Sequence, residues 1–164
     1  MNTNEMKLEL ITLGGGAHAL ASQILGNPDD ASDAVQDSYA KVLGKPGAYK
    51  ADKGPLKPWF LRVVRNRCLD LLRRRRPSDE PVDTLPDKNA TPEQAAEIDE
   101  RDRELKRALV SISNDQRQIL ILRDYLDLSY AEIADVIDVA PGTVMSRMHR
   151  ARLALREVLK SYEN

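Results

Sequence analysis

Cysteine, tryptophan and phenylalanine each occur only once in this chain of 164 residues, and there are only two histidines. A single cysteine, Cys68, cannot form an internal disulfide, and with His18 and His149 it does not have the spacing of zinc ligands. No apolar run approaches the roughly 20 residues that a membrane-spanning helix needs. Residues 1–13 carry Glu5 and Glu9 instead of the basic and then apolar pattern of a signal peptide. These absences predict a cytoplasmic protein with no membrane insertion, no metal and no cofactor.

The residue types of an enzyme active site are also sparse. Ser113, Cys68 and the two histidines lie in different segments, and their spacing does not indicate a nucleophile paired with a base. The three glycines at 14–16 have no preceding strand, so they do not match a phosphate-binding loop. We therefore expect no catalytic residue and no enzymatic activity. Cys68 is expected to pack in a helical core.

The formal net charge of -1 conceals a strong separation of charge along the chain. Residues 1–76 contain 13 Lys and Arg against 8 Asp and Glu, so this segment is basic. Residues 77–104 contain 3 against 10 and are acidic, whereas residues 105–164 are nearly balanced with 9 against 8. Residues 77–92 contain four of the nine prolines and are predicted to form a flexible acidic linker. Two lobes on either side of this linker, residues 1–76 and 93–164, are therefore expected.

Helical spacing of apolar residues is found in both lobes and strand patterns are almost absent, which predicts an all-α fold of two small helical domains. The first lobe is expected to contain three helices. One covers residues 17–25, after the glycines at 14–16 that break any earlier helix. The second is opened by Asn27 and Pro28, and the third covers residues 58–76, starting at Pro58.

The second lobe is expected to contain four helices. Three of them follow start signals in which a Ser or Thr precedes a Gln or Glu by three positions, namely Thr91 with Gln94, Ser113 with Gln116, and Ser129 with Glu132. The last helix begins near Gly142 after the short turn at 138–141, which gives the final helix pair the layout of a helix-turn-helix.

Two segments have the composition of nucleic-acid contacts. Seven arginines lie between positions 62 and 76. This density favours contact with a nucleic-acid phosphate backbone. The alternative is a solvated helix end, where the cations interact favourably with the helix dipole. Residues 142–160 include five basic residues and only one acidic residue. This excess of positive charge favours DNA binding over the alternative, a helix hairpin whose basic face is only solvated. Upstream, Tyr49 lies beside two lysines in a loop of the kind that stacks an unpaired base.

Several motifs together resemble the extracytoplasmic-function sigma factors of bacterial RNA polymerase. They occur in order along nearly the whole chain, at 27–39, 49–54, 58–61 with Asn66 and Asp70, 128–134 and 142–152. The resemblance implies that residues 1–76 are sigma region 2, residues 77–92 a linker in the RNA exit path, and residues 93–164 sigma region 4. The glycine-rich start implies an abbreviated first helix of region 2.

The resemblance also implies core RNA polymerase, promoter DNA and an anti-sigma factor as partners. The residues implied to dock on the β′ clamp helices are Asp33, Gln36 and Asp37, and region 4 is implied to contact the β flap. The residues implied to read and melt the minus-ten element are Tyr49, Lys50, Lys53, Arg62, Arg65, Asn66, Arg73 and Arg74. The residues implied to read the minus-thirty-five element are Thr143, Ser146, Arg147, His149 and Arg150.

Two other functions fit parts of the sequence. A sigma-like decoy that binds an anti-sigma protein would share the fold, but it would not need the arginines at 65, 73–76, 147 and 150. A stand-alone helix-turn-helix repressor would explain the second lobe and leave the first unexplained. Met145 and His149 depart from the residues usual in the family, so the promoter sequence is not carried over from the resemblance.

Overall fold

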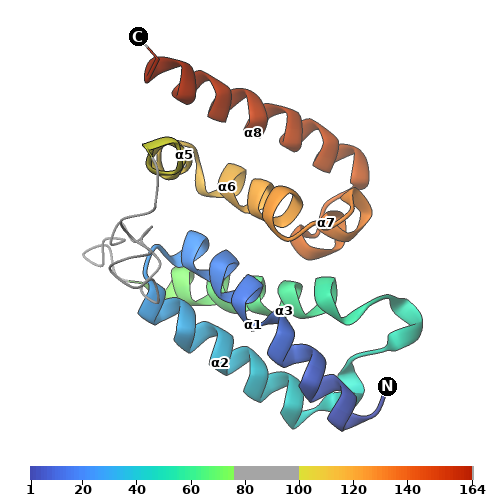
Figure 1. The fold of residues 1–164 in the computed structure, drawn as a ribbon. Coiled ribbons are helices and arrows are strands. Elements are labelled where there is room, and N and C mark those ends of the chain that lie inside the picture. Colours follow the sequence, from blue (N-terminus) through green and yellow to red (C-terminus); the bar gives the residue numbers. More distant parts are fainter. Residues whose placement is uncertain (76–99, 164) are drawn as a thin grey trace.

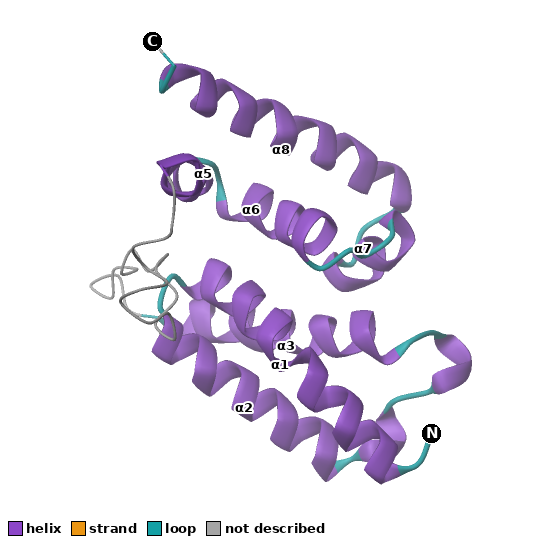
Figure 2. Ribbon diagram, in the orientation of Figure 1, coloured by secondary structure: helices purple, strands orange, loops and turns teal. Residues whose placement is uncertain are grey.

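The computed structural model describes residues 1–75 and 100–163, and all regular elements in these ranges are helical (Figures 1 and 2). The first lobe consists of α1 (Thr3–Leu25), α2 (Pro28–Gly44) and α3 (Leu56–Arg74), with the short 3-10 turns η1 (Pro46–Ala48) and η2 (Ala51–Lys53) between α2 and α3. The second lobe consists of α5 (Glu100–Ser111), α6 (Asn114–Leu120), the π-helical turn η3 (Ile121–Tyr125), α7 (Tyr130–Ile137) and α8 (Pro141–Ser161). The expected all-α fold is confirmed. The linker at 77–92 and the start signal at Thr91 lie outside the described residues.

Helix α1 differs from the sequence prediction. It begins at Thr3 and runs without interruption through the three glycines, so the prediction of a short helix starting at residue 17 is wrong. The start is defined by Asn2, whose side chain accepts a hydrogen bond from the Glu5 backbone N–H at 2.8 Å while the Glu5 carboxylate accepts from the Asn2 N–H. Burial of Met6 and Leu10 in the core of the lobe then offsets the low helix propensity of glycine.

The predicted starts of α2, α6 and α7 are confirmed, whereas α3 begins at Leu56, two residues before the predicted Pro58. The Asn27 side chain accepts hydrogen bonds from the N–H groups of Asp29 and Asp30, and Pro28 occupies the first helical position of α2. Complete capping boxes are formed by Ser113 with Gln116 and by Ser129 with Glu132. These short-range signals are sufficient to set where α2, α6 and α7 begin.

The core of the first lobe is built from the inner faces of its three helices. The rings of Tyr39 on α2 and Phe60 on α3 stack with centroids 5.2 Å apart. The Tyr39 hydroxyl reaches across to α1 and donates a hydrogen bond to the Leu10 carbonyl oxygen at 2.9 Å. Cys68 is fully buried in the same core, as the sequence predicted.

The second lobe packs along one face of α8. Val144, Met148 and Ala151 on that face are fully buried or nearly so. The Arg117 guanidinium caps the end of α5 by donating to three carbonyl oxygens there, those of Leu109, Val110 and Ile112, at 2.8 to 3.2 Å. An arginine in the role of a C-cap ties α6 to the end of α5.

The two lobes pack against each other, with α3 on α7 and α1 on α6 and η3 (Figure 1). Leu126 lies in the interface, where its Cδ2 approaches Gly16 so closely that a Cβ at Gly16 would be 2.7 Å away. The Asn114 side chain donates to the Ile24 carbonyl oxygen at 2.9 Å, and Lys57 Nζ donates to the Leu126 carbonyl oxygen. Within the described ranges, each helix is too short or too polar to cross a membrane.

Candidate functional site

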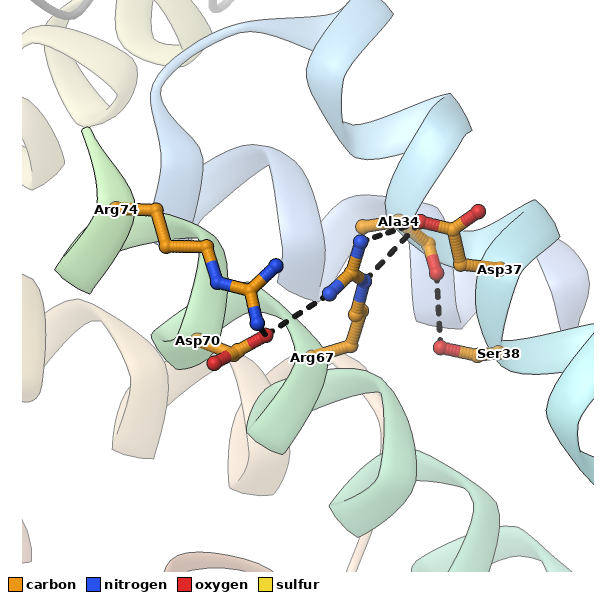
Figure 3. Close-up of polar contacts among 6 residues, drawn as sticks. All are labelled: Ala34, Asp37, Ser38, Arg67, Asp70 and Arg74. Atoms are coloured by element: carbon orange, nitrogen blue, oxygen red, sulfur yellow. Dashed lines mark hydrogen bonds and ion pairs between the residues drawn. The ribbon is translucent and has the colours of Figure 1, made fainter.

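The three residues predicted to dock on polymerase share one face of α2. Asp33, Gln36 and Asp37 are exposed, whereas Ala34 and Ser38 on the opposite face are buried. The buried Ser38 hydroxyl is satisfied locally because it donates to the Ala34 carbonyl oxygen at 2.8 Å (Figure 3). The spacing of three and four residues therefore presents the polar side chains together while the small residues between them pack inward.

Arg67 on α3 bridges this face of α2 to the end of its own helix (Figure 3). Its Nη2 lies 3.0 Å from Asp37 Oδ2, and its Nη1 lies 2.9 Å from Asp70 Oδ2. Arg74 adds a second cation 3.4 Å from the same oxygen of Asp70. The Asp37 carboxylate is thus held in one orientation at the surface, although the side chain remains 49% exposed. Sequence reasoning did not identify Arg67 as the residue that orients Asp37, because the two are 30 positions apart.

The same face borders a hollow of about 510 Å³ between α2 and the end of α3, lined by Leu25, Asp30, Asp33, Gln36, Asp37, Leu71, Arg74 and Arg75. Arg75 closes one end of it, donating to the Leu25 carbonyl oxygen at 3.0 Å and lying 3.5 Å from Asp30 Oδ2. Three carboxylates and two guanidinium groups therefore line the same hollow as the apolar side chains of Leu25 and Leu71. A surface that combines charged and apolar side chains in this way is suited to a protein contact.

The loop between α2 and α3 carries the residues predicted to stack an unpaired base. The Tyr49 ring packs against the Trp59 ring with centroids 5.2 Å apart and a tilt of 51°. The Tyr49 hydroxyl donates to the Gly54 carbonyl oxygen at 2.8 Å, and Gly54 itself has a φ of 136° that favours glycine. Tyr49 therefore stabilises the shape of the loop through this bond while its side chain remains partly exposed, and Lys50 and Lys53 are exposed.

The remaining minus-ten candidates lie on α3 and differ in exposure. Arg62, Asn66, Arg73 and Arg74 are exposed, as expected for nucleic-acid contacts. Arg65 is half-buried, and its Nε donates to Gln118 Oε1 of α6 at 2.7 Å. Burial lowers the pKa of the Arg65 guanidinium, an effect opposed by Asp115 and Asp138 and reinforced by Arg147. Gln118 and Arg147 both belong to the second lobe, so this lobe surrounds one of the predicted DNA contacts of the first.

The minus-thirty-five candidates lie in the first turns of α8. Asp138 ends α7 in the left-handed conformation with a φ of 59°, and Pro141 opens α8, which produces the short turn that the sequence predicted. Ser146, Arg147, His149 and Arg150 are exposed and Thr143 is half-buried. Met145 is 60% exposed on the same part of the helix, so it adds an apolar side chain to this surface. The five predicted residues therefore share one accessible stretch of helix.

Comparisons with known proteins match both lobes separately. A family model described as "Sigma-70 region 2" matches residues 12–77, and one described as "Sigma-70, region 4" matches residues 102–155. The chain is 32% identical over 152 residues to the ECF RNA polymerase sigma factor SigE of Mycolicibacterium smegmatis, covering 90% of this chain and 58% of that protein. It is 33% identical over 142 residues to the ECF RNA polymerase sigma factor SigM of Mycobacterium tuberculosis strain H37Rv, covering 87% of this chain and 70% of that protein.

Solved structures resemble the whole arrangement of helices. A chain in the complex of the sigma factor RpoE with the anti-sigma factor NepR from Bartonella quintana superposes with a TM-score of 0.77 and is 30% identical, covering 95% of this chain and 97% of that chain. A chain in the complex of CnrH with the cytosolic domain of CnrY superposes with a TM-score of 0.71. Its 21% identity is low, and it covers 98% of this chain and 90% of that chain. This second likeness concerns the fold alone.

Proposed function

Because the chain belongs to the extracytoplasmic-function (ECF) sigma factors of RNA polymerase, we propose that it binds core RNA polymerase and directs promoter-specific initiation of transcription. The observation that carries this proposal is the presence of three separate surfaces on one chain: the acidic face of α2, the basic face of α3 with its loop, and the exposed start of α8. The chain supplies recognition and leaves bond chemistry to the polymerase. Its place of action is then the bacterial cytoplasm, where the polymerase works.

The acidic face of α2 is proposed to dock on the β′ clamp helices. A partner helix laid along α2 would meet Asp33, Gln36 and Asp37 at successive turns, since residues three and four apart lie on one face. Arg67 supports this role because it fixes the Asp37 carboxylate before the partner arrives, which lowers the conformational entropy lost on binding.

Promoter DNA is proposed to contact both lobes. On region 2, the exposed Arg62, Asn66, Lys50 and Lys53 suit the melted minus-ten strand, with Arg73 and Arg74 toward the phosphate backbone. On region 4, the start of α8 suits the major groove at the minus-thirty-five element, because the first turns of a recognition helix meet the base edges. Region 4 is also proposed to contact the β flap.

An anti-sigma factor is proposed as the regulatory partner. A similar solved chain, at 30% identity, comes from a complex of a sigma factor with the anti-sigma factor NepR, and its likeness covers both lobes. The polymerase-docking and DNA-facing surfaces of this chain are accessible when it is free, so a protein that covers them would keep the factor from polymerase.

Two matched substitutions test the proposed docking surface. Asp37→Asn and Asp70→Asn each remove one of the two carboxylates that Arg67 contacts, but only Asp37 lies among the docking residues. Asp37→Asn is expected to weaken competition with a labelled sigma factor for core polymerase by about tenfold or more, because hydrogen bonds to charged groups contribute roughly 1.5 to 3 kcal/mol. Asp70→Asn is expected to compete like the wild type.

The possible outcomes distinguish a failure of the proposed docking surface from a failure of the proposed sigma-factor function. Equal losses in both variants would show that the Arg67 network acts only on structure, and equal competition in both would remove Asp37 from the docking surface. If the wild-type chain fails to compete at all, the sigma-factor proposal is overturned and the decoy function is favoured. Circular dichroism of both variants checks that helicity is unchanged.

A further inference from the structure

A cleft with walls of opposite charge lies where the two lobes meet. Its volume is about 460 Å³. One wall is the minus-ten loop and the start of α3, with Lys50, Lys53 and Arg62. The other wall is α7, which contributes Glu132 and Asp135. The basic wall consists of residues proposed above to bind the minus-ten strand.

Beside the cleft, two arginines of α3 contact polar side chains of the second lobe directly. Arg62 Nη2 lies 3.9 Å from Oδ1 of Asp138, the residue that ends α7. Arg65, one turn further along α3, is half-buried and donates to the Gln118 side chain at 2.7 Å. Both arginines are minus-ten candidates, and both are engaged by region 4. The polar groups of region 4 therefore stand where a DNA strand would otherwise stand.

The closed arrangement is incompatible with binding to both promoter elements at once. Arg65 of region 2 and Arg147 of region 4 are close enough for Arg147 to lower the pKa of the Arg65 guanidinium. The two promoter elements are separated by about 25 base pairs, as their names state, which is roughly 85 Å of DNA at 3.4 Å per base pair. The lobes must separate before each surface reaches its element. The structure thus describes the chain before promoter binding.

We propose that the acidic edge of α7, formed by Glu132, Asp135 and Asp138, occupies the minus-ten face of region 2 in the free protein and stands in for the phosphates of the DNA strand. Region 4 then acts as an internal competitor of minus-ten DNA. A tethered competitor is present at millimolar effective concentration, so even weak ionic contacts suffice. The apparent affinity for single-stranded DNA then equals the affinity of the open form multiplied by the fraction of molecules in which the lobes are apart. The proposal rests on the assignment of this face of region 2 to DNA.

The test cancels the net negative charge of the acidic edge and keeps the fold. The cleft variant carries Asp135→Lys and Asp138→Asn; asparagine tolerates the left-handed backbone at position 138, and Glu132 is left in place because it completes the capping box of α7. The control variant carries Glu157→Lys and Glu163→Gln, the same change in net charge at the end of α8 far from α7 (Figure 1). The probe is a fluorescein-labelled 14-nucleotide single-stranded DNA of random sequence, followed by anisotropy at physiological salt.

The cleft variant is expected to bind the probe about tenfold more tightly than the wild type, whereas the control gains less than about threefold from its added positive charge. Small-angle scattering is expected to show a larger radius of gyration for the cleft variant alone. Equal gains in both variants, or no gain in the cleft variant, would overturn the proposal. Failure of all three proteins to bind would overturn it together with the minus-ten assignment, while core binding would still be decided by the Asp37 and Asp70 pair.

Discussion

Arg65 and Arg67 are two positions apart on α3 and yet serve different partners. Arg67 projects toward α2 and bridges Asp37 and Asp70, with its side chain 32% exposed. Arg65 projects toward the second lobe and binds Gln118. Two residues along a helix differ by about 200° in direction, which sends neighbouring arginines of one basic cluster to opposite faces. The arginines of this run therefore differ in their contacts within the protein.

Cys68, which follows these arginines on α3 and is buried in the core, is expected to be chemically inert. Burial raises the pKa of its thiol to about 12, and the opposing effects of Arg67 and Arg65 do not offset it. Because the thiolate is the reactive form, a pKa shift of this size lowers its fraction at pH 8 by about 1000-fold. The native protein should therefore react with a disulfide reagent far more slowly than the protein unfolded in guanidinium. A native rate within tenfold of the unfolded rate would contradict the burial.

Arg147 is expected to contribute to recognition of the upstream promoter element. Replacing it with alanine should cost about 1 to 3 kcal/mol of discrimination if it makes a bidentate base contact. Run-off transcription should fall on promoters that need the minus-thirty-five element and stay unchanged where that element is dispensable. Arg156→Ala, an exposed arginine further along α8, is the matched control. Permanganate footprinting measures strand opening in both Arg147→Ala and Asn66→Ala. An opening defect in Arg147→Ala that is absent from Asn66→Ala would reverse the assignment of the minus-ten and minus-thirty-five elements to the two lobes.

At the scale of single elements, α1 and η3 depend on contacts that local patterns do not include. In α1, a Cβ at Gly14 would lie 2.6 Å from the Tyr39 hydroxyl, so the helix and α2 approach closely at this glycine. In η3, the Leu126 N–H donates to the Ile121 carbonyl oxygen at 2.9 Å, five residues back, which marks a π turn. That turn directs Leu126 toward Gly16 of α1. Both irregular features serve packing between elements.

The glycines of α1 are expected to respond differently to the same substitution. Gly15→Ala meets no atom within 4 Å and should raise the free energy of unfolding by about 0.5 to 1 kcal/mol, because alanine favours the helix. Gly14→Ala should lower it, since the new methyl group displaces the Tyr39 hydroxyl from the Leu10 carbonyl oxygen. Urea unfolding measures both. Tyr39→Phe should relieve the clash in a Gly14→Ala background; if the double variant remains as unstable as Gly14→Ala, the proposed steric cause is wrong.

At the scale of the whole molecule, the two lobes share a continuous buried core in addition to their polar contacts. Because Gly16 of α1 has no side chain, Leu126, the residue that follows η3, packs into this interface. Gly16→Leu should therefore separate the lobes and raise the radius of gyration measured by small-angle scattering, because the larger side chain has no room beside Leu126. Gly15→Leu is the control, since nothing lies within 4 Å of its Cβ position. Identical scattering from the two variants would contradict close packing of the lobes in solution.

Interactions within a few residues were enough to predict much of this protein. Capping residues such as Asn27, Ser113 and Ser129 accept hydrogen bonds from backbone groups two or three positions away. The spacing of apolar residues determines which face of each helix is buried. Both features can therefore be predicted from the sequence. The exposure of Asp33, Gln36 and Asp37 on α2 and of the start of α8 follows from the same spacing. The roles assigned to these surfaces come from the family resemblance and stay predictions.

Only the tertiary structure decided the course of α1, the contacts of Tyr49 with Trp59 and Gly54, and the pairing of the two lobes. The Arg65–Gln118 bond joins residues 53 positions apart, and the Asn114–Ile24 bond joins residues 90 positions apart. No local pattern specifies such partners, because they depend on how whole helices pack. The three glycines have a low helix propensity, so α1 depends on packing for its stability in this stretch. Tyr39 and Leu126 approach the helix closely there, which requires residues without a side chain at positions 14 and 16.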